Sequence, residues 1–138
     1  MGSKSILMID DDPDFANAIR LLLESAGYRV EVVHNPKDGF AALEKGTFAL
    51  VILDVMMGRG AEGIIAARKL KKQKDLKIPP ILMLTGIREQ TGFFFVGDPK
   101  HDTYLPVDGF LEKPVEKLIL LAEVERLVSG PEKVEGKE

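Results

Sequence analysis

The residues best suited to chemistry in this sequence are acids, a threonine and a lysine, each of which follows a short apolar run. In chain order they are Asp10, Asp11, Asp12, Asp54, Thr85 and Lys113. Carboxylates gathered at one place repel each other and raise one another's pKa unless a cation lies among them. Mg²⁺ suits such a group because it takes oxygen ligands and leaves room for phosphate oxygens. A lysine charge and a threonine hydroxyl could then hold a phosphoryl group during its transfer.

The apolar runs that precede these residues are predicted to be strands of a parallel sheet. The expected strands are residues 6–9, 28–33, 48–53, 81–84 and 109–111, most of them apolar on both faces. Helical patterns alternate with them, which favours βαβ crossovers with helices on both faces of the sheet. In such an α/β fold the ligand site lies at the carboxyl ends of the strands, where the polar residues are found.

Four helices are expected between and after the strands. The first begins near Pro13, where Asp12 can cap it, and Gly27 stops it. Its apolar stripe is Phe15, Ala18, Ile19, Leu22, Leu23 and Ala26. The others are Pro36–Lys45, closed by Gly46, then residues 62–74, and a last helix after Pro114 that ends at residues 130–131. The stripe of the last helix is Leu120, Leu121, Val124, Leu127 and Val128.

Composition limits the class of protein. The 138 residues, of which 45% are hydrophobic and 30% charged, predict one globular domain over residues 1–130 with a charged tail over 131–138. A net charge of -3 with scattered basic residues disfavours direct nucleic-acid binding, and neither an export signal nor a membrane span is expected. The absence of cysteine excludes thiol chemistry and is compatible with a reducing, cytoplasmic location.

Four segments resemble, in order, the signature segments of response-regulator receiver domains in two-component signalling. They are ILMIDDDP at residues 6–13, LVILDVMM at 50–57, ILMLTG at 81–86 and GFLEKP at 109–114. The resemblance covers nearly the whole chain. It implies a flavodoxin-like, doubly wound sheet of five parallel strands in the order 2-1-3-4-5. It also implies a signalling switch that uses Mg²⁺ and is not a turnover enzyme.

The resemblance implies a role for each acid in a phosphoryl transfer. Asp54 would accept the group from a sensor histidine kinase or a histidine phosphotransfer protein. Asp11 would bind Mg²⁺ directly with Asp10 assisting, and the backbone carbonyl of Met56 would be a further ligand. Asp12 is expected outside the site as a helix cap, where its charge favours the helix dipole.

The resemblance also assigns the switch. Thr85 and Lys113 would bind the phosphoryl oxygens, and Phe110 matches an aromatic residue that rotates inward when the threonine moves. The result would be an altered surface for an unidentified downstream protein. His34 and His101 are expected to be surface residues rather than ligands.

The chain departs from the family pattern between the fourth and fifth strands. The segment at residues 86–108 is longer than the corresponding segment of the family. Glycines and prolines interrupt it where a fourth helix is expected. The segment at residues 92–97, Gly-Phe-Phe-Phe-Val-Gly, has two interpretations. Its phenylalanines could cover the sheet as core, or they could form a partner or homodimer surface.

Two other functions remain open at this stage. A haloacid-dehalogenase-like phosphatase would use Asp10 and Asp12 as nucleophile and general acid, but it would leave Asp54 without a role. A pseudo-receiver would keep the fold and signal by protein contact alone. The complete set of expected site residues argues against this second alternative, and the altered segment at residues 86–108 argues for it.

Overall fold

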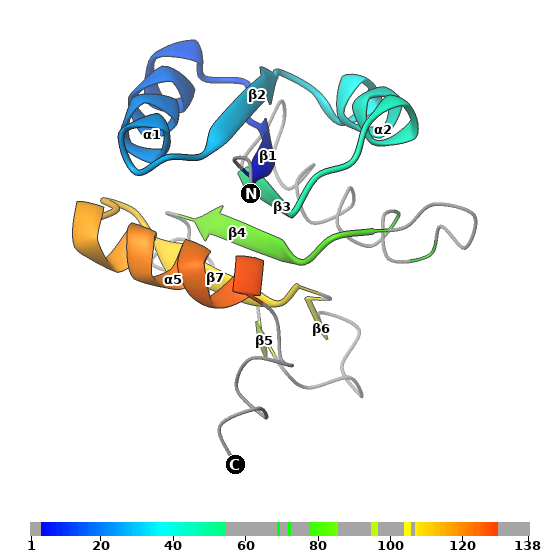
Figure 1. Ribbon diagram of the computed structural model, residues 1–138. Coiled ribbons are helices and arrows are strands. Elements are labelled where there is room, and N and C mark those ends of the chain that lie inside the picture. Colours follow the sequence, from blue (N-terminus) through cyan, green and yellow to red (C-terminus); the bar gives the residue numbers. More distant parts are fainter. Residues whose placement is uncertain are drawn as a thin grey trace.

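The computed structural model describes residues 4–54, 69, 72, 78–85, 95–96, 104–105 and 107–129, and its main feature is a five-stranded parallel sheet (Figure 1). The strands of this sheet are β1 (Ser5–Ile9), β2 (Arg29–Val33), β3 (Leu50–Asp54), β4 (Ile81–Thr85) and β7 (Gly109–Glu112). Their spatial order is β2-β1-β3-β4-β7, and every neighbouring pair is parallel. Because β7 is the fifth of these strands along the chain, the expected order 2-1-3-4-5 is confirmed.

The helices that the structure describes in full are α1 (Pro13–Ser25), α2 (Pro36–Lys45) and α5 (Lys117–Ser129). The Asp12 side chain caps α1, as expected, by accepting hydrogen bonds from two backbone amides of its first turn. Gly27 follows the helix with a φ of 100°, a left-handed conformation that favours glycine. Among the described residues, no helix is both long and apolar enough to cross a lipid bilayer.

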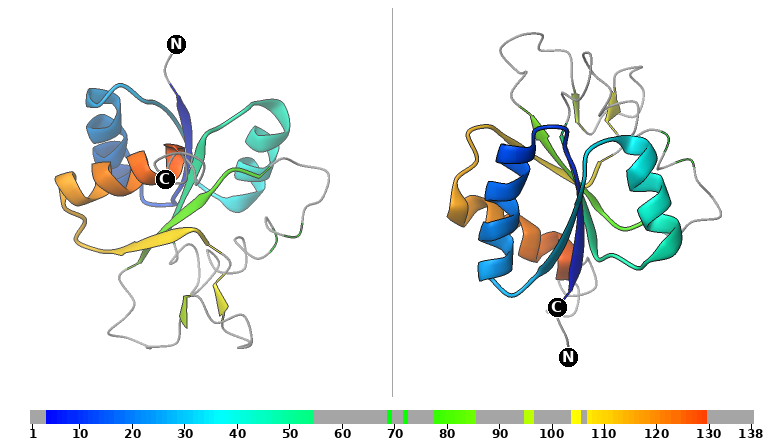
Figure 2. Two further views of the ribbon diagram at one scale, coloured as in Figure 1. Left: turned by 60° about the horizontal axis from the view of Figure 1, so that its bottom comes forward. Right: turned by 90° about the horizontal axis from the view of Figure 1, so that it is seen from above.

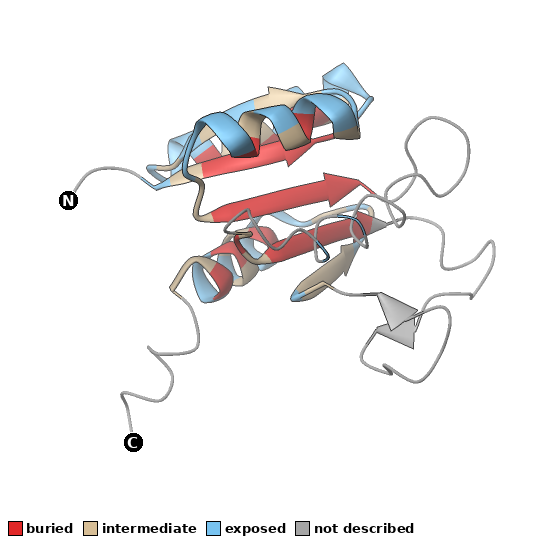
Figure 3. Cartoon of the chain, turned by 90° about the vertical axis from the view of Figure 1, so that its right-hand side faces the viewer, coloured by how far each residue is buried: buried red, intermediate tan, exposed pale blue. Residues whose placement is uncertain are grey.

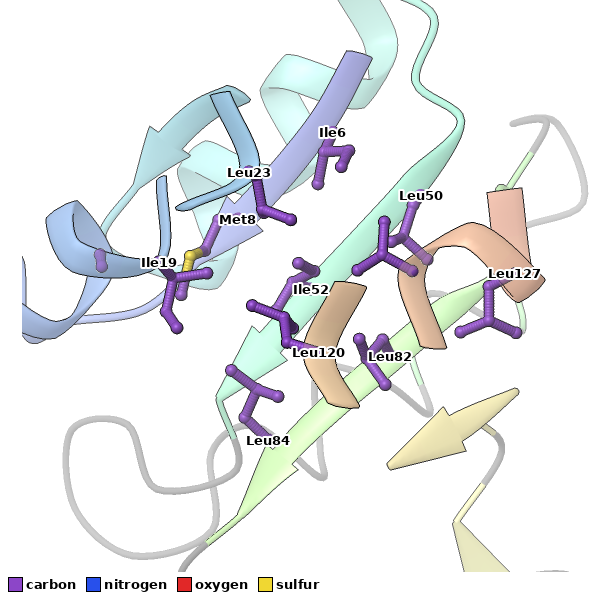
Figure 4. Packing of buried hydrophobic residues seen from close by; sticks show 12 residues of the cluster. Ile6, Met8, Ile19, Leu23, Leu50, Ile52, Leu82, Leu84, Leu120 and Leu127 are labelled. Atoms are coloured by element: carbon purple, nitrogen blue, oxygen red, sulfur yellow. The ribbon is translucent and has the colours of Figure 1, made fainter. Parts of the chain in front are cut away.

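The helices lie on both faces of the sheet, α1 and α5 on one face and α2 on the other (Figure 2). Successive strand residues therefore point to opposite cores. The core under α1 and α5 contains Ile6, Met8, Leu50, Ile52, Leu82 and Leu84 from the strands (Figure 4). The core under α2 contains Leu7, Ile9, Val51, Leu53, Ile81 and Met83. The three central strands are thus buried on both faces, as expected for a parallel sheet (Figure 3).

One detail of the predicted core is wrong. Ala18 and Ala26 were expected in the apolar stripe of α1, but both are exposed, and the buried alanine of this helix is Ala16. Alanine is small enough for either face of a helix, so its position reports the helix phase poorly. Strand β2 lies at the edge of the sheet, as the expected order 2-1-3-4-5 implies, and its residues Arg29 and Glu31 are exposed.

The start of β7 is tethered to the start of β4. The Asp108 amide donates to the Ile81 carbonyl at 2.9 Å, and the Ile81 amide donates to Oδ2 of Asp108 at 2.8 Å. The Arg126 guanidinium of α5 donates to the Asp108 carbonyl at 3.3 Å. These contacts fix the parallel register in which Leu82 pairs with Gly109.

The unusual segment before β7 contains two short strands in the part that the structure describes. They are β5 (Phe95–Val96) and β6 (Tyr104–Leu105), which pair in parallel as a separate sheet. The two interpretations of the phenylalanine cluster concern side chains that the structure does not describe. Most of the expected helix at 62–74, the tail at 131–138 and His101 also lie outside the described residues.

We expect Ile52→Ala to destabilise the fold strongly. Ile52 lies at the centre of β3 with no exposed surface, and its truncation should leave a cavity between the sheet and α5. The free energy of unfolding should fall by about 3 kcal/mol. Urea unfolding followed by circular dichroism measures this change. Leu21→Ala on the outer face of α1, where Leu21 is 54% exposed, is the control and should cost less than about 0.5 kcal/mol.

Candidate functional site

The acids meet at the carboxyl ends of β1 and β3 because of the strand register. Ile9 pairs with Leu53, so the next residues, Asp10 and Asp54, lie side by side. The Asp10 amide continues the ladder to β2 by donating to the Val33 carbonyl at 3.0 Å. Both side chains are buried, with 0% of Asp10 and 3% of Asp54 exposed. Two adjacent carboxylates without solvent need compensating positive charge.

Lys113, which follows the outer strand β7, supplies one such positive charge. It follows β7, which is separated from β3 by β4, and its ammonium nitrogen Nζ lies 3.2 Å from Oδ2 of Asp54. The Asp54 side chain is 4% exposed and the Lys113 side chain 29%. The pair is therefore closed to solvent at the acid and partly open at the cation. The peptide bond from Lys113 to Pro114 is cis.

A third acid, Asp11, completes a cluster that can hold a metal ion. One carboxylate oxygen from each of Asp10, Asp11 and Asp54 lies within 4.8 Å of the others. Asp10 and Asp54 are buried in this cluster, and Asp11 is exposed. Within the described part of the chain, Oδ2 of Asp10 is buried and has no hydrogen-bond partner. An all-oxygen donor set with one unpaired buried oxygen fits the coordination preference of Mg²⁺.

Burial of Asp10 makes the ionised form of its carboxyl group unfavourable. Burial raises the pKa of its carboxyl from 3.8 to about 7, and the charge of Asp54 adds to the rise. The Asp12 amide, which donates to Oδ1 of Asp10 at 2.9 Å, acts in the opposite direction. Without a bound cation, the ionised form of the buried Asp10 carboxyl is therefore unfavourable.

His34 contacts the site through the backbone, which the sequence did not indicate. It is exposed, so its expected place on the surface is confirmed. Its Nδ1 lies 2.9 Å from the carbonyl oxygen of Asp10. The histidine follows β2 and so reaches the end of β1, but no spacing in the sequence distinguishes this contact from a solvated histidine.

The expected switch residues lie on β4 and β7. Thr85 is the last residue of β4 and pairs with Glu112, and its side chain lies outside the described part of the structure. Phe110 pairs with Met83 and is half-buried against the core under α2. Met56, the expected carbonyl ligand, lies outside the described residues.

Phe15 is a site neighbour that the sequence interpretation placed only in the core. It belongs to the first turn of α1, and the centre of its ring lies 4.3 Å from Nζ of Lys113. Nearly a hundred residues separate the two along the chain, so only the fold brings them together.

The whole arrangement has a counterpart among known proteins. The family model of the response regulator receiver domain matches residues 6–125. The chain belongs to this family. Among solved structures, the signal receiver domain of a response regulator from Bermanella marisrubri is 31% identical, with a TM-score of 0.76 over 91% of this chain and 98% of that one.

Further relatives agree in fold or in sequence. The receiver domain of a sensor histidine kinase from Pseudomonas aeruginosa, described with a magnesium ion coordinated in its active site cleft, has a TM-score of 0.76 at 23% identity over 94% of this chain and 100% of that one. Regulatory protein VanRB of Enterococcus faecalis is 31% identical over 89% of this chain and 51% of its own length. The chain thus spans about half the length of VanRB.

Membership of this family settles the class of activity. Receiver domains of response regulators are signalling modules and not turnover enzymes. The phosphatase alternative also conflicts with the geometry, because Oδ1 of Asp12 accepts the amides of Asp14 and Phe15 at 3.1 and 3.2 Å. A carboxylate engaged as a helix cap is poorly placed to act as a general acid.

Proposed function

We propose that this receiver domain is a phosphorylation-dependent switch whose phosphoacceptor is Asp54. The observation that supports this most directly is the 3.2 Å contact between Nζ of Lys113 and the buried carboxylate of Asp54, beside Asp10 and Asp11. The donor would be a phosphohistidine on a sensor histidine kinase or a histidine phosphotransfer protein. Each part of this geometry serves one step of the transfer.

The transfer makes one bond and breaks one. An oxygen of the Asp54 carboxylate attacks phosphorus, the phosphorus–nitrogen bond of the donor breaks, and the imidazole nitrogen keeps the electron pair. Lys113 is already at the carboxylate, so its charge can move to the oxygens of the arriving phosphoryl group. Mg²⁺, held by Asp10, Asp11, Asp54 and the Met56 carbonyl, would neutralise charge on those oxygens.

The output would depend on Thr85 and Phe110. We assign Thr85, at the end of β4, to a phosphoryl oxygen, and Phe110 to the transmission of its movement across β7. Half-burial of Phe110 supports this role, since its ring lies between the core under α2 and the solvent. A phosphoryl group shifts the balance between two conformations only as far as it contacts one of them better.

We assign residues 1–130 to the receiver domain and residues 131–138 to a charged tail, and we place the protein in the cytoplasm with its kinase. Its downstream partner is a protein, bound through the surface that the switch alters. Relatives of about twice the length are named transcriptional regulatory proteins, and for this chain we propose no direct contact with nucleic acid. Self-association through the segment at residues 92–97 is a further hypothesis, which sedimentation with and without beryllofluoride tests.

Mapping the modified residue tests the proposal. The full chain is incubated with acetyl phosphate and Mg²⁺, the acyl phosphate is reduced with borohydride, and the peptides are analysed by mass spectrometry. We expect homoserine at position 54, and its absence in samples with excess EDTA or without acetyl phosphate. Modification at another residue, or none at all, would contradict the assignment, and the second result would favour the pseudo-receiver.

A further inference from the structure

We infer that Phe15 is a positioning residue for Lys113, holding its ammonium group at the mouth of the site through a cation–π contact. The ring centre lies 4.3 Å from Nζ, well inside the range of about 6 Å over which such contacts are attractive. The same ammonium group donates a hydrogen bond to Oδ2 of Asp54 at 3.2 Å. The inference rests on the proposed function, because it concerns how Lys113 is held for the phosphoryl transfer.

Lys113 needs such support because of where its backbone lies. It follows β7, and β4 separates β7 from the strand that carries Asp54. Neighbouring strands are about 4.8 Å apart, so the side chains of Lys113 and Asp54 must together bridge roughly two strand spacings. A lysine is a compact charge on a flexible four-carbon stem, and fixing it costs rotamer entropy. A second contact that selects the extended conformation would lower that cost.

The ring of Phe15 is itself held by the acid loop. Asp10 accepts the Asp12 amide at 2.9 Å through Oδ1, and Asp12 in turn accepts the Phe15 amide at 3.2 Å. The ring is half-buried and packs against the core formed with α5. The same run of acids therefore contributes two carboxylates, Asp10 and Asp11, to the cluster and fixes the backbone of the aromatic residue that faces the cation.

The contact should persist through the transfer. When Asp54 becomes an acyl phosphate, its negative charge moves outward and the partner of Lys113 changes. Phe15 is neutral and belongs to α1, so its face remains available to the ammonium group in both states. An apolar side chain of similar size, such as leucine, would fill the space without attracting the cation.

The test compares Phe15→Leu and Phe15→Tyr with the wild-type chain. With acetyl phosphate and Mg²⁺, Phe15→Leu should be phosphorylated about 3- to 10-fold more slowly, and Phe15→Tyr at close to the native rate. In a Lys113→Ala background, Phe15→Leu should cause no further slowing, because the ring acts through the lysine. Phe40→Leu, the same change in a half-buried ring on α2, is the control and should leave the rate unchanged.

A spectroscopic measurement separates this inference from the proposed function. In ¹³C-lysine-labelled protein without phosphodonor, the ε-methylene protons of Lys113, identified by comparison with Lys113→Ala, should be shifted upfield by the ring. The shift should persist in Phe15→Tyr and vanish in Phe15→Leu. Native shifts and rates in Phe15→Leu would overturn the inference while leaving Asp54 as acceptor. If Asp54 proved not to be the acceptor, the shifts would still decide whether Phe15 holds Lys113.

Discussion

Asp54→Asn should take up no measurable phosphoryl group from acetyl phosphate, a loss of at least about a thousandfold, or about 4 kcal/mol in activation free energy. The amide has the shape of the carboxylate but lacks its nucleophilic charge. It still offers an oxygen to Lys113, which lies 3.2 Å from Oδ2 in the native protein. The fold should therefore be kept, and the loss should be chemical rather than structural.

The measurement is incorporation of ³²P from labelled acetyl phosphate, with circular dichroism to confirm folding. Asp38→Asn makes the same change in an exposed acid on α2 and should leave incorporation unchanged. Incorporation into Asp54→Asn at the native rate would show that another residue accepts the group. A loss in Asp38→Asn equal to that in Asp54→Asn would show that the assay reports general damage.

Asp10→Asn should make the metal-free protein more stable at pH 8 and remove its response to Mg²⁺. The Asp10 carboxylate is buried beside Asp54 and has one oxygen without a hydrogen-bond partner among the described residues. Asparagine removes the charge and keeps Oδ1 as acceptor for the Asp12 amide. The gain should approach a few kcal/mol, since burying an uncompensated charge is costly.

The sign of the pH dependence follows from the pKa of Asp10, which burial raises from 3.8 to about 7. Between these values the folded protein binds more protons at this site than the unfolded chain. The contribution of Asp10 to the free energy of unfolding in EDTA is therefore largest below pH 3.8 and is lost as pH rises through about 7, a decrease on the order of 4 kcal/mol. The advantage of Asp10→Asn should shrink accordingly between pH 8 and pH 5.

Urea unfolding at pH 5 and pH 8, with EDTA and then with Mg²⁺, measures both effects. Mg²⁺ should stabilise the wild type and leave Asp10→Asn unchanged. Asp11→Asn is the matched control: Asp11 is exposed and is the expected direct ligand, so removing its charge should also abolish the Mg²⁺ effect but should not stabilise the metal-free protein. An Asp10→Asn variant that is less stable than the wild type at pH 8 in EDTA would show that the charge of Asp10 is compensated.

The ends of the strands were predictable because each apolar run is short and is followed at once by a polar residue. Asp10 and Asp54 were expected at one edge of the sheet, and the pairing of Ile9 with Leu53 puts them there. Helix α2 was predicted with its observed bounds, since Pro36 and Gly46 mark both of its ends. Start and stop signals for a helix, such as Pro36 and Gly46, act locally and do not depend on the rest of the fold.

Contacts that depend on tertiary structure were not predictable. The ring of Phe15 contacts Lys113 only because the fold brings the first turn of α1 close to the residue that follows β7. The contact of His34 with the Asp10 carbonyl depends on β2 lying beside β1.

The bonds between Asp108, Ile81 and Arg126 have a mechanical consequence. They anchor β7 at its first residue, at the end of the sheet farthest from the acids. Because its first end is anchored, β7 would move least at Gly109 and most at its last residue, Glu112, which immediately precedes Lys113. A change at Asp54 would therefore tilt β7, an outer strand of the sheet, and would leave its register with β4 intact.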